Sequence, residues 1–202
     1  MKHYSMLCLG DSYTIGEGLP LHESFPYQLL QSLRKEKIHF YAPEIVAKTG
    51  WTTFELEEHL LHHELNEHYD FVTLLIGVNN QYRGLGLSSF REEFDFLIQK
   101  ALHFANQLNR QVFVISIPDW GVTPFARDRD TKLIASDIDD YNNICATMAA
   151  GYNVHYIDIT ISQRIDGAND AFLAGDQLHP SAGEYAKWAG LLFNCIRDQI
   201  AS

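Results

Sequence analysis

A short strand that runs directly into a polar turn is encoded by Met6-Leu7-Cys8-Leu9-Gly10-Asp11-Ser12. Four consecutive apolar residues followed by turn formers are typical of a strand that is covered by helices on both faces. Strands of this kind belong to parallel sheets in α/β proteins, so this stretch sets the expectation for the rest of the chain.

The remaining sequence alternates between apolar strand patterns and longer amphipathic helix patterns. Strands are predicted at 70–76, 112–117 and 154–159, with a weaker one at 38–47 that Pro43 breaks or places at an edge. Helices are predicted at 24–35, 52–66, 88–109, 136–150 and 181–200. This alternation predicts right-handed crossovers and a mostly parallel sheet between two layers of helices.

Several helix starts have recognisable signals. Ser24 is a candidate N-cap with Pro26 in the first turn, and Thr52 with Glu55 forms a capping-box pattern. Ser181 and Glu184 form the same pattern before the last helix. The segments 118–135 and 160–180 have weak patterning, and loops of that length are more often functional than incidental.

Length and composition indicate one globular domain over residues 1–202, with 46% hydrophobic and 20% charged residues. The net charge of −11 opposes binding to nucleic acid and stable association with anionic membranes. Three well-separated cysteines are expected to be reduced thiols. Neither a signal peptide nor a run of ~18 apolar residues is seen, which favours a cytoplasmic location, although a processed precursor stays open.

Residues suited to acyl transfer stand where the predicted strands end. In open α/β sheets ligands bind beyond the carboxyl ends of the strands, and Ser12 follows the first strand there. A serine needs a base to become a nucleophile, and His179 is the candidate, held extended by Pro180. Asp176, three residues upstream, is predicted to orient the imidazole.

The same chemistry needs donors for an oxyanion. Gly50 follows the second strand and, having no Cβ, lets its N–H approach a substrate closely. Asn79 ends the third strand and can aim a side-chain N–H at the same point. Together with the N–H of Ser12, these groups predict an oxyanion hole with three donors.

In order along the chain, Gly10-Asp11-Ser12, Gly50, Gly77-Val78-Asn79 and Asp176-Gln177-Leu178-His179-Pro180 resemble the four blocks of the SGNH (GDSL-type) hydrolases. The resemblance spans nearly the whole chain. It implies a flavodoxin-like three-layer α/β/α fold with strand order 2-1-3-4-5, and esterase, thioesterase or lipase-type chemistry without a cofactor. Two positions depart from the family pattern: Tyr13 replaces the name-giving leucine, and Asn80 stands where aspartate is usual.

Aromatic residues beside the predicted donors suggest the kind of substrate. Trp51, Tyr82 and Trp120 are expected to rim the cleft, with Phe125 further along the same loop as Trp120. These rings would either contact the substrate or only cap the core. Asp11 and Asn80 are added as candidate contacts. Such a wall suits a small soluble ester with a short acyl group, and the sequence leaves the oligomeric state open.

Other functions remain to be weighed against this one. Acyl transfer to another acceptor, or lysophospholipase or thioesterase activity, would use the same triad. A flavodoxin-like module for FMN would need a phosphate-binding loop, and no Walker pattern is present. An α/β-hydrolase is excluded because Thr14 replaces the second glycine of its nucleophile motif.

Isolated turn, histidine and acidic patterns also have simpler explanations. Gly10-Asp11-Ser12 alone would be typical of a turn. The histidines at positions 59, 62, 63 and 68 are interpreted as part of a solvated helix face. The aspartates at 137, 139 and 140 are interpreted as acidic residues in the first turn of a helix, where the macrodipole favours them. No metal is expected.

Overall fold

A five-stranded parallel sheet forms the centre of the computed structural model, which describes residues 2–201. Its strands are β2 (Met6–Asp11), β4 (Glu44–Lys48), β5 (Phe71–Leu75), β6 (Val112–Ile115) and β7 (His155–Ile157). They lie in the order β4-β2-β5-β6-β7, and all neighbours are parallel. With these strands counted along the chain, the order is 2-1-3-4-5, which confirms the predicted fold class.

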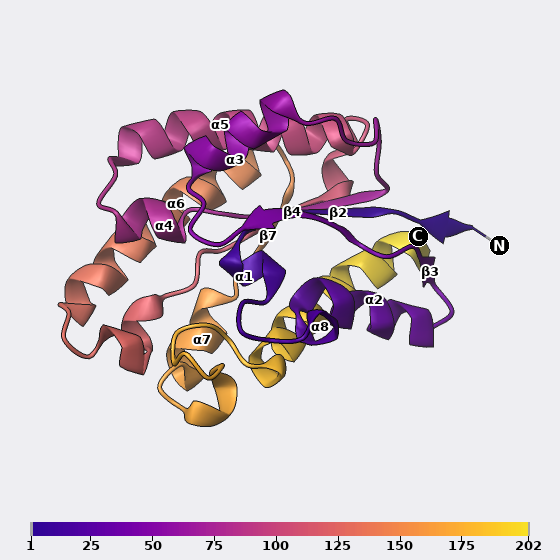
Figure 1. The fold of residues 1–202 in the computed structure, drawn as a ribbon. Coiled ribbons are helices and arrows are strands. Elements are labelled where there is room, and N and C mark those ends of the chain that lie inside the picture. Colours follow the sequence, from indigo (N-terminus) through magenta and orange to yellow (C-terminus); the bar gives the residue numbers. More distant parts are fainter. Residues whose placement is uncertain (1, 202) are drawn as a thin grey trace.

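Two layers of helices enclose this sheet (Figure 1). One layer holds α3 (Thr53–His62), α5 (Leu87–Phe104) and α6 (Thr131–Gly151). The other holds α2 (Phe25–Lys35) and α8 (Ala182–Ala201), which pack against each other. Because both faces of the sheet are covered, the residues of β2 are buried along its whole length, as the continuous apolar run predicts.

The weaker strand predicted at 38–47 is two strands. Pro43 separates β4 from β3 (His39–Phe40), which pairs in parallel with β1 (His3–Tyr4) outside the main sheet. The predicted break at Pro43 therefore occurs, since proline has no N–H to donate to a ladder. The extra β1–β3 pair was not predicted.

Helix ends differ from the predictions for identifiable reasons. The Thr52–Glu55 capping box is present, with Thr52 N donating to Glu55 over 2.8 Å. Helix α6 starts five residues earlier than predicted, because Asp130 accepts a hydrogen bond from the N–H of Leu133 over 3.1 Å. The predicted helix 88–109 ends at Phe104, where Asn106 and Gln107 turn into the left-handed region.

Two predicted caps use their side chains differently. Ser24 stands at the start of α2, but its hydroxyl donates to the carbonyl of Leu21. Pro26 lies in the first turn of α2 as predicted. The hydroxyl of Ser181 donates to the carbonyl of Ala171, and buried Glu184 accepts from the indole N–H of Trp188.

Short helices at the carboxyl edge of the sheet carry the residues of interest. They are α1 (Ser12–Ile15) after β2, α4 (Val78–Tyr82) after β5 and α7 (Thr160–Asp166) after β7. Five 3-10 turns complete the structure: 21–23, 109–111, 120–122, 124–126 and 170–172. The predicted loops 118–135 and 160–180 therefore contain helical turns and the start of α6.

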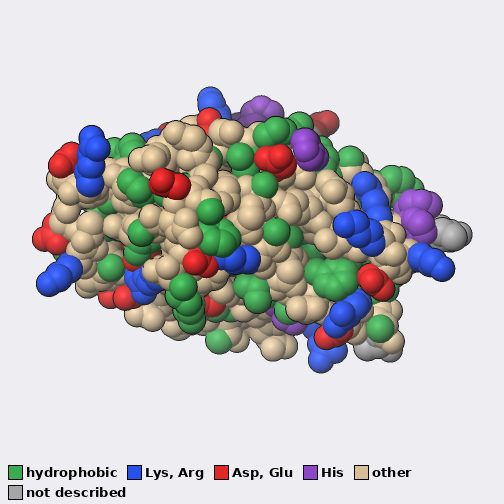
Figure 2. Space-filling view, turned by 90° about the horizontal axis from the view of Figure 1, so that it is seen from below, with side chains coloured by type: hydrophobic (Ala, Val, Ile, Leu, Met, Phe, Trp, Pro, Cys, Tyr) green, Lys and Arg blue, Asp and Glu red, His purple; other side chains and the backbone are tan. Residues whose placement is uncertain are grey.

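Charged side chains are mixed on the face seen in Figure 2, where acidic and basic groups alternate rather than gather by sign. Among residues 2–201, no helix combines the length and apolar character needed to cross a membrane.

Candidate active site

Ser12 is held at the junction between β2 and α1. The side chain of Asp11 caps α1 by accepting a hydrogen bond from the N–H of Tyr13 over 3.0 Å. A Cβ on Gly10 would lie 2.1 Å from the hydroxyl oxygen of Thr14 and 2.4 Å from the carbonyl oxygen of Leu75. Only glycine fits this close approach, which lets the chain turn sharply and present Ser12.

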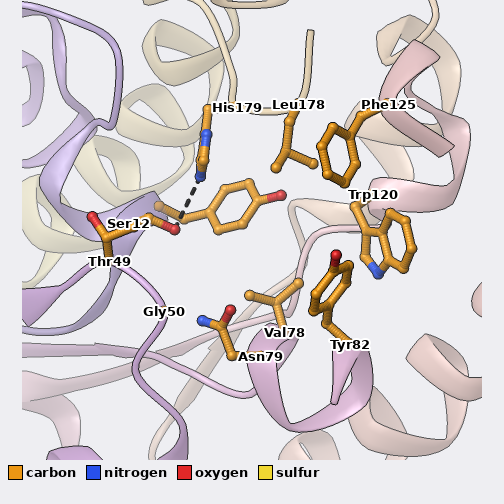
Figure 3. Close-up of a pocket in the computed structure, with 11 residues that line it drawn as sticks. Ser12, Thr49, Gly50, Val78, Asn79, Tyr82, Trp120, Phe125, Leu178 and His179 are labelled. Atoms are coloured by element: carbon orange, nitrogen blue, oxygen red, sulfur yellow. Dashed lines mark hydrogen bonds between the residues drawn. The ribbon is translucent and has the colours of Figure 1, made fainter. Parts of the chain in front are cut away.

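His179 and Ser12 meet across 167 residues of sequence. The Nε2 atom of His179 lies 3.0 Å from Oγ of Ser12, and its Nδ1 atom lies 2.6 Å from Oδ2 of Asp176. Figure 3 shows the imidazole pointing at the serine hydroxyl. The three predicted residues are thus joined by one line of hydrogen bonds.

The loop that carries Asp176 is shaped around its carboxylate. Oδ1 of Asp176 accepts hydrogen bonds from the N–H groups of Leu178 and His179, each over 3.0 Å. Gln177 between them has a φ of 60°, so both N–H groups turn toward the same oxygen. Partial burial by itself raises the pKa of Asp176. The hydrogen bonds from the side chain and backbone of His179 and from Leu178 outweigh it, and the net pKa lies below the usual value.

This arrangement selects the state of the imidazole. An ionised Asp176 only accepts hydrogen bonds, so Nδ1 of His179 carries a proton toward it. In the neutral ring Nε2 then has a free lone pair, which faces the hydroxyl of Ser12. His179 is therefore placed to take the proton of the Ser12 hydroxyl.

Gly50 and Asn79 lie on the side of the cavity opposite His179 (Figure 3). Gly50 has a φ of 84°, a left-handed conformation that favours glycine, and its carbonyl accepts from the guanidinium of Arg83. Nδ2 of Asn79 donates to the carbonyl of Trp51 over 2.9 Å and to Asp11 over 3.4 Å. The first bond fixes the amide plane, and the longer one is the weaker and more easily redirected.

The space in front of Ser12 is a cavity of about 230 Å³. Much of its lining is apolar, and these side chains are drawn in Figure 3: Val78, Tyr82, Trp120, Phe125 and Leu178. The Trp120 ring meets those of Tyr82 and Phe125 edge-on, at centroid distances of 5.2 and 6.1 Å. The Trp120 N–H is bonded to Gln81 over 2.7 Å, which fixes the indole.

Three of the predicted substrate contacts have other roles in the structure. Asn80 is fully buried and bonds Thr53 at the start of α3, with its Oδ1 3.0 Å from the Thr53 N. Asp11 is buried as the cap of α1, and burial raises its pKa to about 7. The Trp51 ring packs 4.8 Å from His59, and only its carbonyl contacts a predicted donor. None of these three residues is among those that line the cavity in front of Ser12.

The sequence reasoning missed several residues that line the cavity. Thr49, Val78 and Leu178 all contribute to it, and each is a direct neighbour of a predicted site residue. Tyr13 lines it as well, although the sequence marked it only as a departure from a motif. In the sequence, their position next to the four motif blocks was the available sign that they belong to the site.

The histidine pattern on α3 forms a ring stack. The rings of His59 and His63 lie 3.7 Å apart at an angle of 16°. Throughout residues 2–201, no three His, Cys, Asp or Glu side chains converge as metal ligands would.

Comparison with known proteins places this site in a family. The model of the GDSL-like lipase/acylhydrolase family matches residues 8–187. The chain belongs to this family. Membership confirms the predicted resemblance and the assignment to the carboxylic ester hydrolases. Among curated protein sequences, no relative matches the chain.

Several solved structures share the fold of this chain. A lipase/acylhydrolase from Enterococcus faecalis is 21% identical, with a TM-score of 0.77 over 97% of this chain and 96% of the other. TesA is 16% identical, with a TM-score of 0.74 over 96% and 98%. The acetyl xylan esterase AlAXEase is 18% identical, with a TM-score of 0.73 over 95% and 99%. At these identities the likeness concerns the fold.

Proposed function

We propose that this protein hydrolyses short-chain carboxylic esters through an acyl-enzyme on Ser12. The observation that carries the proposal is the unbroken line of hydrogen bonds from Asp176 through His179 to Ser12, which faces a cavity of about 230 Å³. A nucleophile, a base and an orienting group in hydrogen-bond contact are what acyl transfer requires.

In the first half of the reaction, Oγ of Ser12 attacks the ester carbonyl carbon while Nε2 of His179 takes its proton. The carbonyl oxygen becomes an oxyanion, which accepts hydrogen bonds from the N–H groups of Ser12 and Gly50 and from Nδ2 of Asn79. The tetrahedral intermediate then collapses. Its bond to the alkoxy oxygen breaks, and the proton on Nε2 passes to the departing alcohol.

In the second half, a water molecule attacks the acyl group and gives a proton to Nε2 of His179. The new oxyanion uses the same donors, and its collapse breaks the bond to Oγ of Ser12. The proton on Nε2 returns to Oγ, and a carboxylic acid leaves. Asp176 stays ionised throughout and stabilises the imidazolium that forms in each half.

The cavity supports a short acyl group. The cavity in front of Ser12 has a volume of about 230 Å³. Large aromatic side chains, Trp120 and Phe125, stand across it from Ser12 (Figure 3). One of the similar structures is an acetyl xylan esterase, which supports acylated carbohydrates as a class to test.

The test is a series of p-nitrophenyl esters from two to twelve carbons, with acyl thioesters and acetylated sugars in parallel. Wild type is expected to prefer short acyl groups, and Ser12→Ala is expected to lose on the order of 10⁴-fold in kcat. Activity that survives in Ser12→Ala would contradict the nucleophile. A kcat/KM that climbs steadily to twelve carbons would contradict the short acyl site, since each buried CH₂ contributes about 0.8 kcal/mol.

A further inference from the structure

The residue after the proposed nucleophile carries an unpaired hydroxyl. Only 2% of Tyr13 is exposed, and its ring lies 4.9 Å from that of His179 and 6.4 Å from that of Trp188. Within the described residues, no protein group forms a hydrogen bond with its buried hydroxyl. A buried hydroxyl without a partner is costly, so such groups generally mark a bound water or a ligand.

Tyr13 is one of the residues that line the cavity in front of Ser12. Two other polar side chains of the lining, Thr49 and Trp120, already have partners. The hydroxyl of Thr49 donates to Glu17, and the indole N–H of Trp120 donates to Gln81. The hydroxyl of Tyr13, in contrast, is buried and has no partner within the described residues.

The phenol is also kept protonated. Burial raises the pKa of Tyr13 well above its usual value, and the carboxylates of Asp11, Asp176 and Asp119 add to this effect. A neutral phenol can donate its proton to an ether, hydroxyl or carbonyl oxygen.

A second buried tyrosine, Tyr185, serves as a comparison because it lies outside the cavity lining. Tyr185 is fully buried, its hydroxyl likewise has no partner within residues 2–201, and its ring lies 5.0 Å from that of Trp188. It does not line the cavity in front of Ser12. Of these two buried tyrosines, whose hydroxyls are unpaired within the described residues, Tyr13 lines the cavity and Tyr185 does not.

We propose that the hydroxyl of Tyr13 determines specificity by donating a hydrogen bond to an oxygen in the acyl part of the substrate. The preferred esters then derive from short acids that carry an ether, hydroxyl or carbonyl oxygen beyond the ester group. This inference rests on the proposed function, since it places the acyl group that is bound to Ser12 in this cavity. We place the acyl part, rather than the alcohol, in the cavity beside Tyr13. The alcohol must leave before water enters, so it is expected to lie on the side of the site that is open to solvent.

The first test compares p-nitrophenyl methoxyacetate with p-nitrophenyl butanoate, in which one CH₂ replaces the ether oxygen. The ratio of their kcat/KM values is measured in wild type, Tyr13→Phe and Tyr185→Phe. The inductive effect of the oxygen is the same in all three proteins. The ratio is expected to fall by about tenfold or more in Tyr13→Phe, the effect of one buried hydrogen bond, and to stay unchanged in Tyr185→Phe.

An unchanged ratio in Tyr13→Phe, or an equal fall in Tyr185→Phe, would overturn the inference. A binding measurement tests the role of Tyr13 independently of ester hydrolysis. It uses calorimetry with two neutral amides, methoxyacetamide and butanamide. Wild type should bind methoxyacetamide more tightly, and Tyr13→Phe should lose that preference even if no ester is hydrolysed. Equal binding of the two amides by wild type would overturn the role of Tyr13 whatever the esterase result.

Discussion

Replacement of Asp176 by asparagine is expected to inactivate the protein through the tautomer of His179. Oδ1 of Asp176 accepts from two backbone N–H groups, those of Leu178 and His179, each over 3.0 Å. The asparagine oxygen must stay there, because its NH₂ group would otherwise face two donors. The NH₂ group then faces Nδ1 of His179, where the carboxylate oxygen now lies at 2.6 Å.

An NH₂ group at this position requires Nδ1 of His179 to accept a hydrogen bond. The ring proton therefore moves to Nε2, the atom that faces Ser12 over 3.0 Å. In that tautomer Nε2 cannot take the serine proton. The expected loss in kcat is about 10⁴-fold, which is typical of the wrong tautomer in a triad of this kind.

The assay is hydrolysis of p-nitrophenyl acetate by the purified variant, with circular dichroism to verify the fold. The matched control is Asp170→Asn, which removes the same charge from an exposed position of the same loop. Asp170→Asn is expected to keep its rate within about twofold, as an exposed charge away from a site has little effect. A folded Asp176→Asn protein that kept a tenth or more of its kcat would refute the reasoning.

Asn79→Ala should lower kcat by roughly 10²–10³-fold with little change in KM, as for the loss of one oxyanion donor; a raised KM with an unchanged kcat would contradict that role. Asn80→Ala should lower the free energy of unfolding in urea by about 1–3 kcal/mol, since it leaves the buried N–H of Thr53 without its partner. An unchanged free energy of unfolding would contradict this, and would mean that the N–H of Thr53 finds another partner. Buried Asp11 has a pKa of about 7, against about 3.9 in an unfolded chain. The folded protein therefore holds this proton to higher pH, and its stability relative to Asp11→Asn should fall by up to about 4 kcal/mol between pH 4 and 7. A difference that stays flat over this range would contradict the burial effect.

The central sheet was predictable because apolar runs encode buried strands directly. Residues 6–9 and 71–75 are apolar or β-branched throughout, and each forms a strand covered on both faces. Short helices such as α1 and α4, of four and five residues, are shorter than any periodic pattern that a sequence can show. They were therefore missed, although they are the elements that carry Ser12 and Asn79.

Helix boundaries depended on backbone conformations with weak sequence signals. Gln107 has a φ of 60°, which its residue type does not suggest, and this turn ends α5 before the predicted residue. The early start of α6 had a signal in Asp130, an ordinary N-cap residue. The prediction nevertheless began this helix at Ser136.

In the candidate site, motif order brought the right blocks together but could not assign neighbouring side chains. Consecutive residues of a helix point in different directions, so Asn79 faces the cavity while Asn80 faces Thr53. Similarly, Gly50 lines the cavity, whereas the ring of Trp51 packs on His59. The sequence does not show which way each side chain points at the strand ends.

Covalent labelling tests the proposed nucleophile most directly. Wild type and Ser12→Ala are treated with an alkyl fluorophosphonate, which traps activated serines, and the intact masses and labelled peptides are measured. One adduct per chain is expected at Ser12, formed in step with the loss of ester hydrolysis and absent from Ser12→Ala. An active protein that stays unlabelled at Ser12, or an adduct at another serine that abolishes activity, would contradict the account.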